Sequence, residues 1–187
     1  MTRSITALAI ALLAYACSDS SPGGLSAEVA SAQTPPKPAP EPAPLPADAS
    51  AAAKLADAYL RLSARLAGDD AKGAGAAAAK VSEAAAVVEG EHAAQIKAAA
   101  AEIAAASDIA RQRAAFERAS NALIALVETS GNPLSTIAYV VRCPMAFDNR
   151  GARWLQASTA IANPYFGASM FSCGSVEAQY APGARKP

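Results

Sequence analysis

From residue 50 onward, apolar residues recur at the spacing of one face of an α-helix. Residues 50–67 give the first example, and the apolar positions on their shared face are Leu55, Tyr59, Leu62 and Leu66. Ser50 is a residue type that favours the cap at the start of a helix, whereas Gly68 favours its end. The pattern therefore predicts a helix over residues 50–67.

Three further segments repeat this amphipathic pattern. The predicted helices cover about residues 70–89, 91–106 and 108–129. Glycine at position 90 and the Gly-Asn-Pro run at 131–133 favour the ends of helices. Four amphipathic helices with short connections predict an antiparallel four-helix bundle, so the apolar faces are interpreted as its core.

The pattern changes after the fourth helix. Thr136–Arg142 is rich in β-branched residues and predicts a strand, and Ser175–Tyr180 predicts a returning strand. Ala152–Gln156, which lies between them, is interpreted as a helical turn. Pairing of the two strands in a small β-hairpin would bring Cys143 and Cys173 close together. The predicted fold is mainly α, a four-helix bundle with this C-terminal strand and loop segment.

The start of the chain has the layout of a secretory signal peptide. Arg3 supplies a positive charge, and a short apolar run from Ile5 to Ala16 follows it. This run is shorter than the roughly 20 apolar residues that span a bilayer, so a transmembrane anchor is the weaker interpretation. Residues 1–16 are therefore expected to be a signal peptide that is removed after export.

The end of this run, Leu13-Ala14-Tyr15-Ala16-Cys17, resembles the lipobox of bacterial lipoproteins. The resemblance implies that Cys17 is lipidated and anchors the protein to a membrane. Ser18 follows it, which by analogy with lipoprotein sorting in enteric bacteria suggests the outer membrane. The alternative is ordinary cleavage after Ala16. Either way, we expect the mature chain in the cell envelope, facing the periplasm.

A proline-rich segment separates this anchor from the helices. Within residues 17–49, seven prolines gather at positions 35, 36, 38, 40, 42, 44 and 46. Proline fixes φ and removes a backbone donor, so this density predicts an extended tether. The expected organisation is a signal peptide (1–16), a lipidated cysteine and linker (17–49), one helical domain (50–180) and a short tail (181–187).

Composition and motifs narrow the function classes. The 187 residues include 16 basic and 16 acidic side chains, so the net charge is zero and no basic excess supports nucleic-acid binding. The sequence contains no phosphate-binding glycine loop, zinc-protease motif or nucleophile elbow. His92 is the only histidine that a catalytic pair could use. We therefore expect a binding or structural protein rather than an enzyme.

The residues that carry candidate chemistry lie near the C-terminus. Met145 follows Cys143 by two positions, and Met170 precedes Cys173 by three. Thiolates and thioethers are soft ligands that select Cu(I), so these four residues are candidate metal ligands. His92 is a further candidate ligand. The alternative is that Cys143 and Cys173 form a disulfide in the oxidising envelope, with the methionines as packing residues.

The same segment carries a resemblance to a known family. The runs Cys-Pro-Met-Ala-Phe-Asp-Asn from Cys143, Asn-Pro-Tyr-Phe-Gly from Asn163, and Met-x-x-Cys-Gly-Ser-Val from Met170 resemble an uncharacterised domain family of bacterial envelope lipoproteins. That family also occurs fused to periplasmic adaptors of copper/silver and other heavy-metal efflux systems.

The resemblance extends over about residues 50–180 and implies that the chain handles a soft metal. It implies Cys143, Met145, Met170 and Cys173 as ligands, with His92 as a further one. An efflux adaptor is the implied partner. A disulfide-stapled structural or protein-interaction module without metal remains the alternative.

Overall fold

The computed structural model describes residues 44–187. The predicted signal peptide, the lipidation site Cys17 and most of the proline-rich linker lie outside the described residues. The helices are α1 (Ala51–Ala67), α2 (Ala71–Ala85), α3 (Glu91–Ala105), α4 (Ile109–Ser130) and the short α5 (Ala146–Asn149), with a 3-10 helix η1 (Gly167–Met170). The strands are β1 (Ala138–Cys143), β2 (Ala152–Gln156) and β3 (Ser175–Tyr180). The predicted mainly helical fold, with four long helices, is confirmed.

Side chains cap three of the four long helices, and one of these caps is Ser50, as expected from the sequence. Ser50 Oγ accepts the Ala53 N–H at 3.1 Å, and the carboxylates of Asp70 and Asp108 accept N–H groups of α2 and α4, each at 2.8 Å. Helix α2 ends at Ala85, before the predicted end near Glu89. Val87, which follows it, is 71% exposed, so no packing at this position compensates for the low helix propensity of valine.

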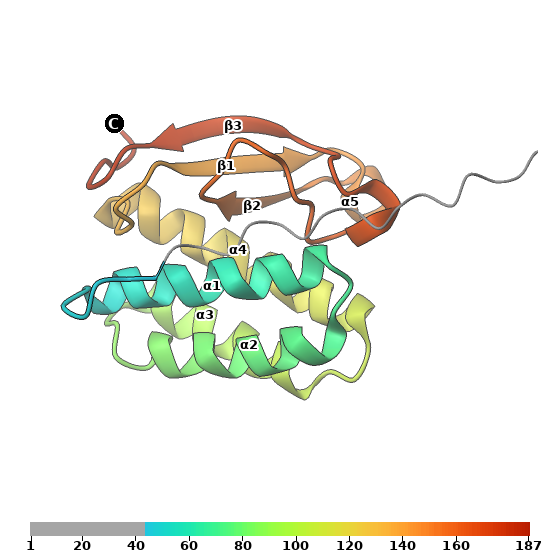
Figure 1. Cartoon of the computed structure of the whole chain (residues 1–187), viewed down its shortest axis with the longest axis horizontal. Helices are drawn as coiled ribbons and strands as arrows, with labels where there is room; N and C mark the ends of the chain where they lie inside the picture. The colour runs from blue at the N-terminus through green and yellow to red at the C-terminus, as the bar shows by residue number, and fades with distance from the viewer. Residues whose placement is uncertain (1–43) are drawn as a thin grey trace, which may run out of the picture. The chain divides into compact units, whose positions relative to one another are not determined.

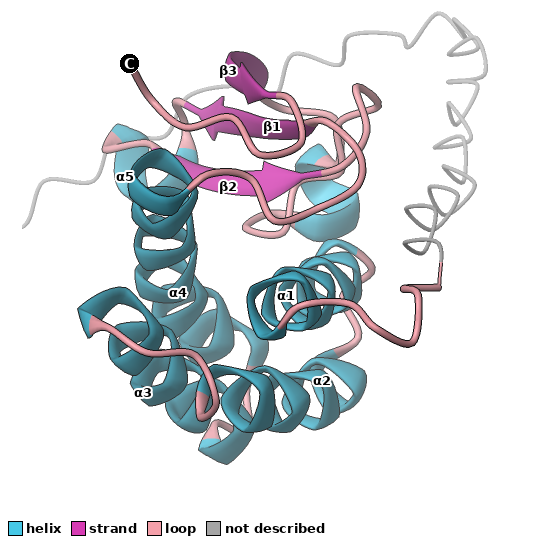
Figure 2. Ribbon diagram, turned by 90° about the vertical axis from the view of Figure 1, so that its left-hand side faces the viewer, coloured by secondary structure: helices cyan, strands magenta, loops and turns pink. Residues whose placement is uncertain are grey.

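Each long helix packs mainly on its neighbour in sequence, α1 on α2, α2 on α3 and α3 on α4. Helices α1 and α4 contact each other much less, and strand β2 contacts both. Figures 1 and 2 show the sheet as a separate layer over α1 and α4, with α2 and α3 on the far side of these helices. The sheet is therefore part of the packed domain rather than an appendage.

The sheet has three antiparallel strands in the order β2-β1-β3. Strand β1 pairs with β2 from Tyr139↔Gln156 to Cys143↔Ala152, and with β3 from Ala138↔Tyr180 to Arg142↔Ser175. The predicted pairing of the segments at 136–142 and 175–180 is therefore confirmed, since β1 pairs with β3. The two strands do not form a hairpin alone, because β2 joins them in a three-stranded sheet.

The prediction of a helical turn at Ala152–Gln156 was wrong, because this segment is strand β2. A five-residue segment is too short to distinguish helical from strand periodicity by its apolar pattern. Long-range contacts hold the extended conformation here. The Leu155 N–H donates to Tyr59 Oη of α1 at 3.2 Å, and Trp154 is fully buried.

An aromatic cluster joins the sheet layer to the helices. Tyr59 of α1 stacks on Phe116 of α4 with ring centroids 5.1 Å apart. Tyr165 lies 5.8 Å from Phe116 and 5.9 Å from Trp154 between ring centroids. Aromatic pairs at these distances stabilise a core beyond the area that they bury. The C-terminal segment is therefore anchored on α1 and α4, and this fixes the position of its two cysteines.

Candidate functional site

Cys143 and Cys173 meet at one end of the sheet. Their Sγ atoms are 2.8 Å apart, and both are free thiols. Cys143 is the last residue of β1 and is fully buried, whereas Cys173 precedes β3 and is partly exposed. The prediction that the paired strands bring these side chains close together is confirmed. We refer to these two residues as the thiol pair.

The chain turns after Cys143 through a left-handed segment. Phe147, Asp148 and Asn149 have φ angles of 52°, 57° and 66°. Left-handed backbone is unfavourable for residues with a Cβ atom, so three in a row need support from their surroundings. The Phe147 ring lies edge-on to Tyr165, and the guanidinium of Arg150 lies 5.0 Å from the Phe147 ring centroid. Arg150 also pairs with Glu117 of α4 through two hydrogen bonds of 2.5 and 2.8 Å.

Asn163 organises the loop that leads to Cys173. It is fully buried, and its side-chain NH₂ donates to the Cys173 carbonyl at 2.9 Å. Its side-chain oxygen accepts the N–H groups of Tyr165 at 2.8 Å and Phe166 at 3.3 Å. Its backbone N–H donates to the Phe171 carbonyl at 2.7 Å. One side chain thus connects the start of this loop with the backbone of Cys173.

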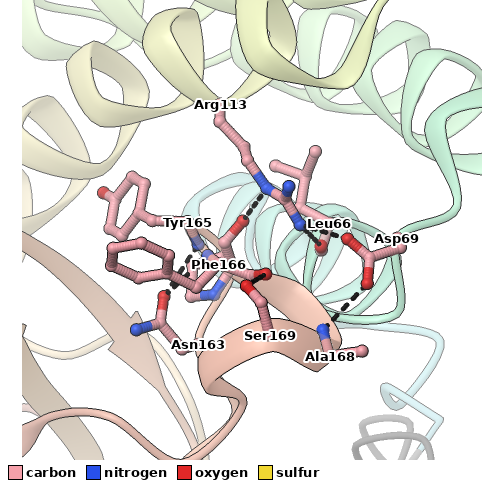
Figure 3. A network of polar contacts seen from close by, with 9 residues as sticks. Leu66, Asp69, Arg113, Asn163, Tyr165, Phe166, Ala168 and Ser169 are labelled. Carbon is pink, nitrogen blue, oxygen red and sulfur yellow. Dashed lines mark hydrogen bonds and ion pairs between the residues drawn. The ribbon is translucent and has the colours of Figure 1, made fainter. Parts of the chain in front are cut away.

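A second polar contact holds the same loop on the helices, as Figure 3 shows. Arg113 of α4 donates to the Pro164 carbonyl, the Leu66 carbonyl and the Asp69 carboxylate at 2.8, 2.8 and 2.6 Å. The other carboxylate oxygen of Asp69 accepts the Ala168 N–H at 2.8 Å. This carboxylate lies where a Cβ atom on residue 167 would stand, so the position needs glycine, which also suits its φ of +58°.

The contact between the sulfurs changes the acidity of Cys173. The hydrogen bond shared with Cys143, assisted by burial and by the charge on Cys143, raises the pKa of the Cys173 thiol to about 11. The Cys173 thiol is therefore protonated at neutral pH. Because the thiolate is the form that binds metals and attacks disulfides, either reaction must first release protons.

The other predicted ligands lie in different places. Met145 is 48% exposed in the turn after Cys143, and Met170 is partly exposed at the end of η1, where its carbonyl accepts the Cys173 N–H at 3.0 Å. His92 lies at the start of α3, in the layer on the far side of α1 and α4 from the sheet. Within residues 44–187, no three His, Cys, Asp or Glu side chains gather closely enough to hold an ion. His92 therefore does not join the thiol pair.

His92 instead lines a groove of about 510 Å³ between α3 and α4. Four alanine residues contribute to its lining, and so do Glu102 and Arg118, which pair with each other. The Nδ1 atom of His92 is buried without a hydrogen-bond partner. Cys17, the predicted lipidation site, lies outside the described residues. None of the helices within residues 44–187 has the length and apolar content needed to span a bilayer.

Sequence reasoning missed the residues that hold the thiol pair in place. The run that starts at Asn163 was noted only for the family resemblance, and nothing local showed that Asn163 reaches Cys173. Nothing near Asp69 in the sequence showed that its carboxylate contacts a loop 99 residues away in the chain. Arg113 lies on a helix whose sequence contains no signal for a contact with the C-terminal loop. Only the tertiary arrangement reveals these three roles.

No curated protein and no solved structure matches this chain. A family model does match part of it. That part begins inside α1 and ends before β1, so it includes most of α1 and all of α2, α3 and α4 but neither cysteine of the thiol pair. Residues 55–134 match the model of the family described as a protein of unknown function, DUF3347.

Proposed function

We propose that this chain is an envelope lipoprotein that binds one soft metal ion, Cu(I), in support of heavy-metal efflux or homeostasis. The observation that carries the proposal is the convergence of two free thiols from positions 30 residues apart in the chain. The exported, lipid-anchored location rests on the N-terminal sequence, and the efflux adaptor as partner rests on the resemblance in the C-terminal runs.

The donor set suits a soft cation. Cys143 and Cys173 supply two sulfur ligands, and Met145 and Met170 each lie within three residues of one of them. Thiolate and thioether ligands favour Cu(I) over hard cations such as Mg²⁺ or Ca²⁺. Cys173, Met145 and Met170 are all at least partly exposed, so an ion could reach the sulfurs from solvent. His92 is left out of this ligand set because it lies in a different layer of the fold.

Metal binding requires the thiol pair to open. A thiolate sulfur lies about 2.3 Å from a bound zinc ion, so two thiolates on opposite sides of an ion of similar size would be about 4.6 Å apart. The observed separation is 2.8 Å. Cys173 precedes β3 in a loop and is the more exposed of the two, so we expect it to make most of this movement.

Titration of the reduced protein with Cu(I), buffered by a competing chelator, tests the proposal. The full-length chain with Cys17→Ser keeps Cys143 and Cys173 as the only thiols. We expect one Cu(I) per chain by native mass spectrometry, loss of that copper in Cys143→Ser and weaker binding in Met145→Leu. His92→Ala serves as the control and should bind like the parent. Absence of binding, or binding that survives Cys143→Ser unchanged, would contradict the proposal.

A second candidate is a disulfide-stapled structural or docking module that binds no metal. The observation that favours it is the sulfur separation, since 2.8 Å is closer to the S–S bond length of about 2.05 Å than to the spacing across an ion. Alkylation of thiols in protein extracted anaerobically from the envelope distinguishes the two. Free Cys143 and Cys173 favour the metal site. A fully oxidised pair, together with retention by an efflux adaptor in a pull-down without metal, favours the module.

A further inference from the structure

We propose that Asn163 is a positioning residue that sets the spacing of the thiol pair. This role rests on the proposed function, in which the thiol pair binds the metal ion. Asn163 touches neither sulfur. It acts on the backbone of Cys173, and through it on the distance between the Cys173 and Cys143 sulfurs.

The two cysteines are held by very different means. Cys143 lies at the end of the central strand β1 and pairs with Ala152 of β2, so the sheet fixes its backbone. Cys173 lies outside the regular strands, between η1 and β3. Its backbone N–H donates to the Met170 carbonyl, and its carbonyl accepts from Asn163 at 2.9 Å. Among these contacts, only the bond from Asn163 ties Cys173 to a residue outside its own turn.

Asn163 is itself held rigidly, so it can act as an anchor. It is fully buried, and both ends of its amide make hydrogen bonds within the loop. The residue next to it, Pro164, has its carbonyl bonded to Arg113, which fixes the loop on α4 and α1. A chain of hydrogen bonds therefore leads from the helical layer through Pro164 and Asn163 to Cys173. A buried amide held in this way is costly to remove, because its partners lose their hydrogen bonds as well.

Asn132 offers a matched control elsewhere in the same domain. It is also an asparagine before proline, is 2% exposed, and its NH₂ donates to the carbonyls of Thr136 and Tyr180, each at 2.8 Å. It fixes the opposite end of the sheet, where Ala138 pairs with Tyr180. Removing Asn132 should cost comparable stability without loosening Cys173.

The closing experiment measures how readily the thiol pair forms a disulfide, without any metal. The full-length chain carries Cys17→Ser in every sample and is equilibrated with mixtures of reduced and oxidised glutathione. In the reaction, the glutathione S–S bond breaks, the Cys143–Cys173 S–S bond forms, and the two protons of the thiol pair pass to two glutathione thiols. The equilibrium constant reports the effective concentration of one protein thiol at the other.

We expect Asn163→Ser to lower this equilibrium constant roughly tenfold or more, because serine can accept the Tyr165 N–H but is too short to reach the Cys173 carbonyl. Asn163→Ala should lower it at least as much, and Asn132→Ala should change it less than about twofold. Near-UV circular dichroism checks that each variant is folded, and the serine variant carries the test if the alanine variant does not fold.

A folded Asn163→Ser protein with the parental constant would overturn the inference. An equal loss in Asn132→Ala would also overturn it, since the effect would then reflect stability alone. Because no copper is present, failure of the Cu(I) titration would leave this result standing. Conversely, if the role of Asn163 is overturned, the Cu(I) proposal is still tested separately by the Cu(I) titration.

Discussion

Asp69 is a single residue on which two layers of the molecule depend. Its backbone is left-handed, with φ of 57°, and its carboxylate accepts hydrogen bonds from Arg113 of α4 and from the Ala168 N–H. Burial alone would raise the pKa of this carboxyl, but the bonds from Ala168 and Arg113 outweigh it, and the pKa lies below its ordinary value. The charged form is therefore favoured in the folded state.

Asp69→Asn tests this contribution, because asparagine has the same shape and tolerates left-handed backbone. We expect the variant to be less stable at pH 7 by about 1 kcal/mol, a modest value because the carboxylate is partly solvated. A lowered carboxyl pKa stabilises the fold above the unfolded pKa and ceases to do so as pH falls through the folded pKa. The difference between parent and variant in urea unfolding should therefore shrink below about pH 4. A difference independent of pH would contradict this account.

Cys173 provides a second residue-scale prediction. Its pKa of about 11 arises first from the hydrogen bond with Cys143, so Cys143→Ala should lower it toward the ordinary thiol value. A drop of two pKa units gives roughly a hundredfold more Cys173 thiolate at pH 8. The less basic thiolate is a weaker nucleophile, which reduces the gain in rate by about tenfold. Alkylation of Cys173 by iodoacetamide at pH 8 should then be up to roughly tenfold faster in the variant. An unchanged rate would contradict the shared hydrogen bond.

The same shift has a consequence for folding. A thiol whose pKa is raised on folding stabilises the reduced protein at all pH values below the unfolded pKa, near 8.5, and this contribution is lost as pH rises toward about 11. Unfolding of the reduced parent in urea should therefore show stability that declines over this alkaline range more steeply than in Cys143→Ala.

At the scale of elements, the turn between β1 and β2 contains the least favourable backbone that the described residues show, with three consecutive left-handed residues. Asp148 is exposed at the centre of this run. We expect Asp148→Gly to raise the free energy of unfolding by about 0.5–1 kcal/mol, because glycine adopts this conformation without a Cβ clash. Asp148→Ala should lower it by a similar amount, since alanine lacks the local hydrogen bonding that helps aspartate there. Urea unfolding of the two variants, side by side, measures both signs.

The elements also show which signals a sequence carries by itself. The four long helices could be predicted because their apolar periodicity extends over several turns and their caps, such as Ser50 and Asp108, are local. Strand β2 could not, because its extended form is held by contacts outside the segment, the ladder with β1 and the bond from the Leu155 N–H to the hydroxyl of Tyr59, 96 residues away. By contrast, the sequence pattern did predict that Cys143 and Cys173 lie close together, because this proximity requires only the pairing of two strands. Asn163, Asp69 and Arg113 hold the C-terminal loop through tertiary contacts, and neither apolar periodicity nor a sequence motif predicts such contacts.

At the scale of the whole molecule, oxidation of the thiol pair should stabilise the fold. A disulfide between Cys143 and Cys173 closes a long loop, and restriction of the unfolded chain is expected to contribute about 3–4 kcal/mol. The sulfurs already approach to 2.8 Å, so we expect little of this gain to be lost to strain. Urea unfolding of oxidised and reduced protein measures the gain, with Cys143→Ser as the control that should not respond to oxidant. Equal stability of the two forms would contradict the prediction.

The guanidinium of Arg113 has a consequence for where this chain can be cut. It bonds to Leu66 and Asp69 within the family-matched residues 55–134 and to Pro164 outside them. Phe116 likewise packs on Tyr165, and Tyr59 Oη accepts the Leu155 N–H. A fragment that stops at residue 134 would present this apolar surface to water and remove the Pro164 carbonyl, one of the three acceptors of the partly buried Arg113. The boundary of the recognisable family is therefore not a boundary of folding, and a recombinant domain intended to be soluble should retain β3 through Tyr180.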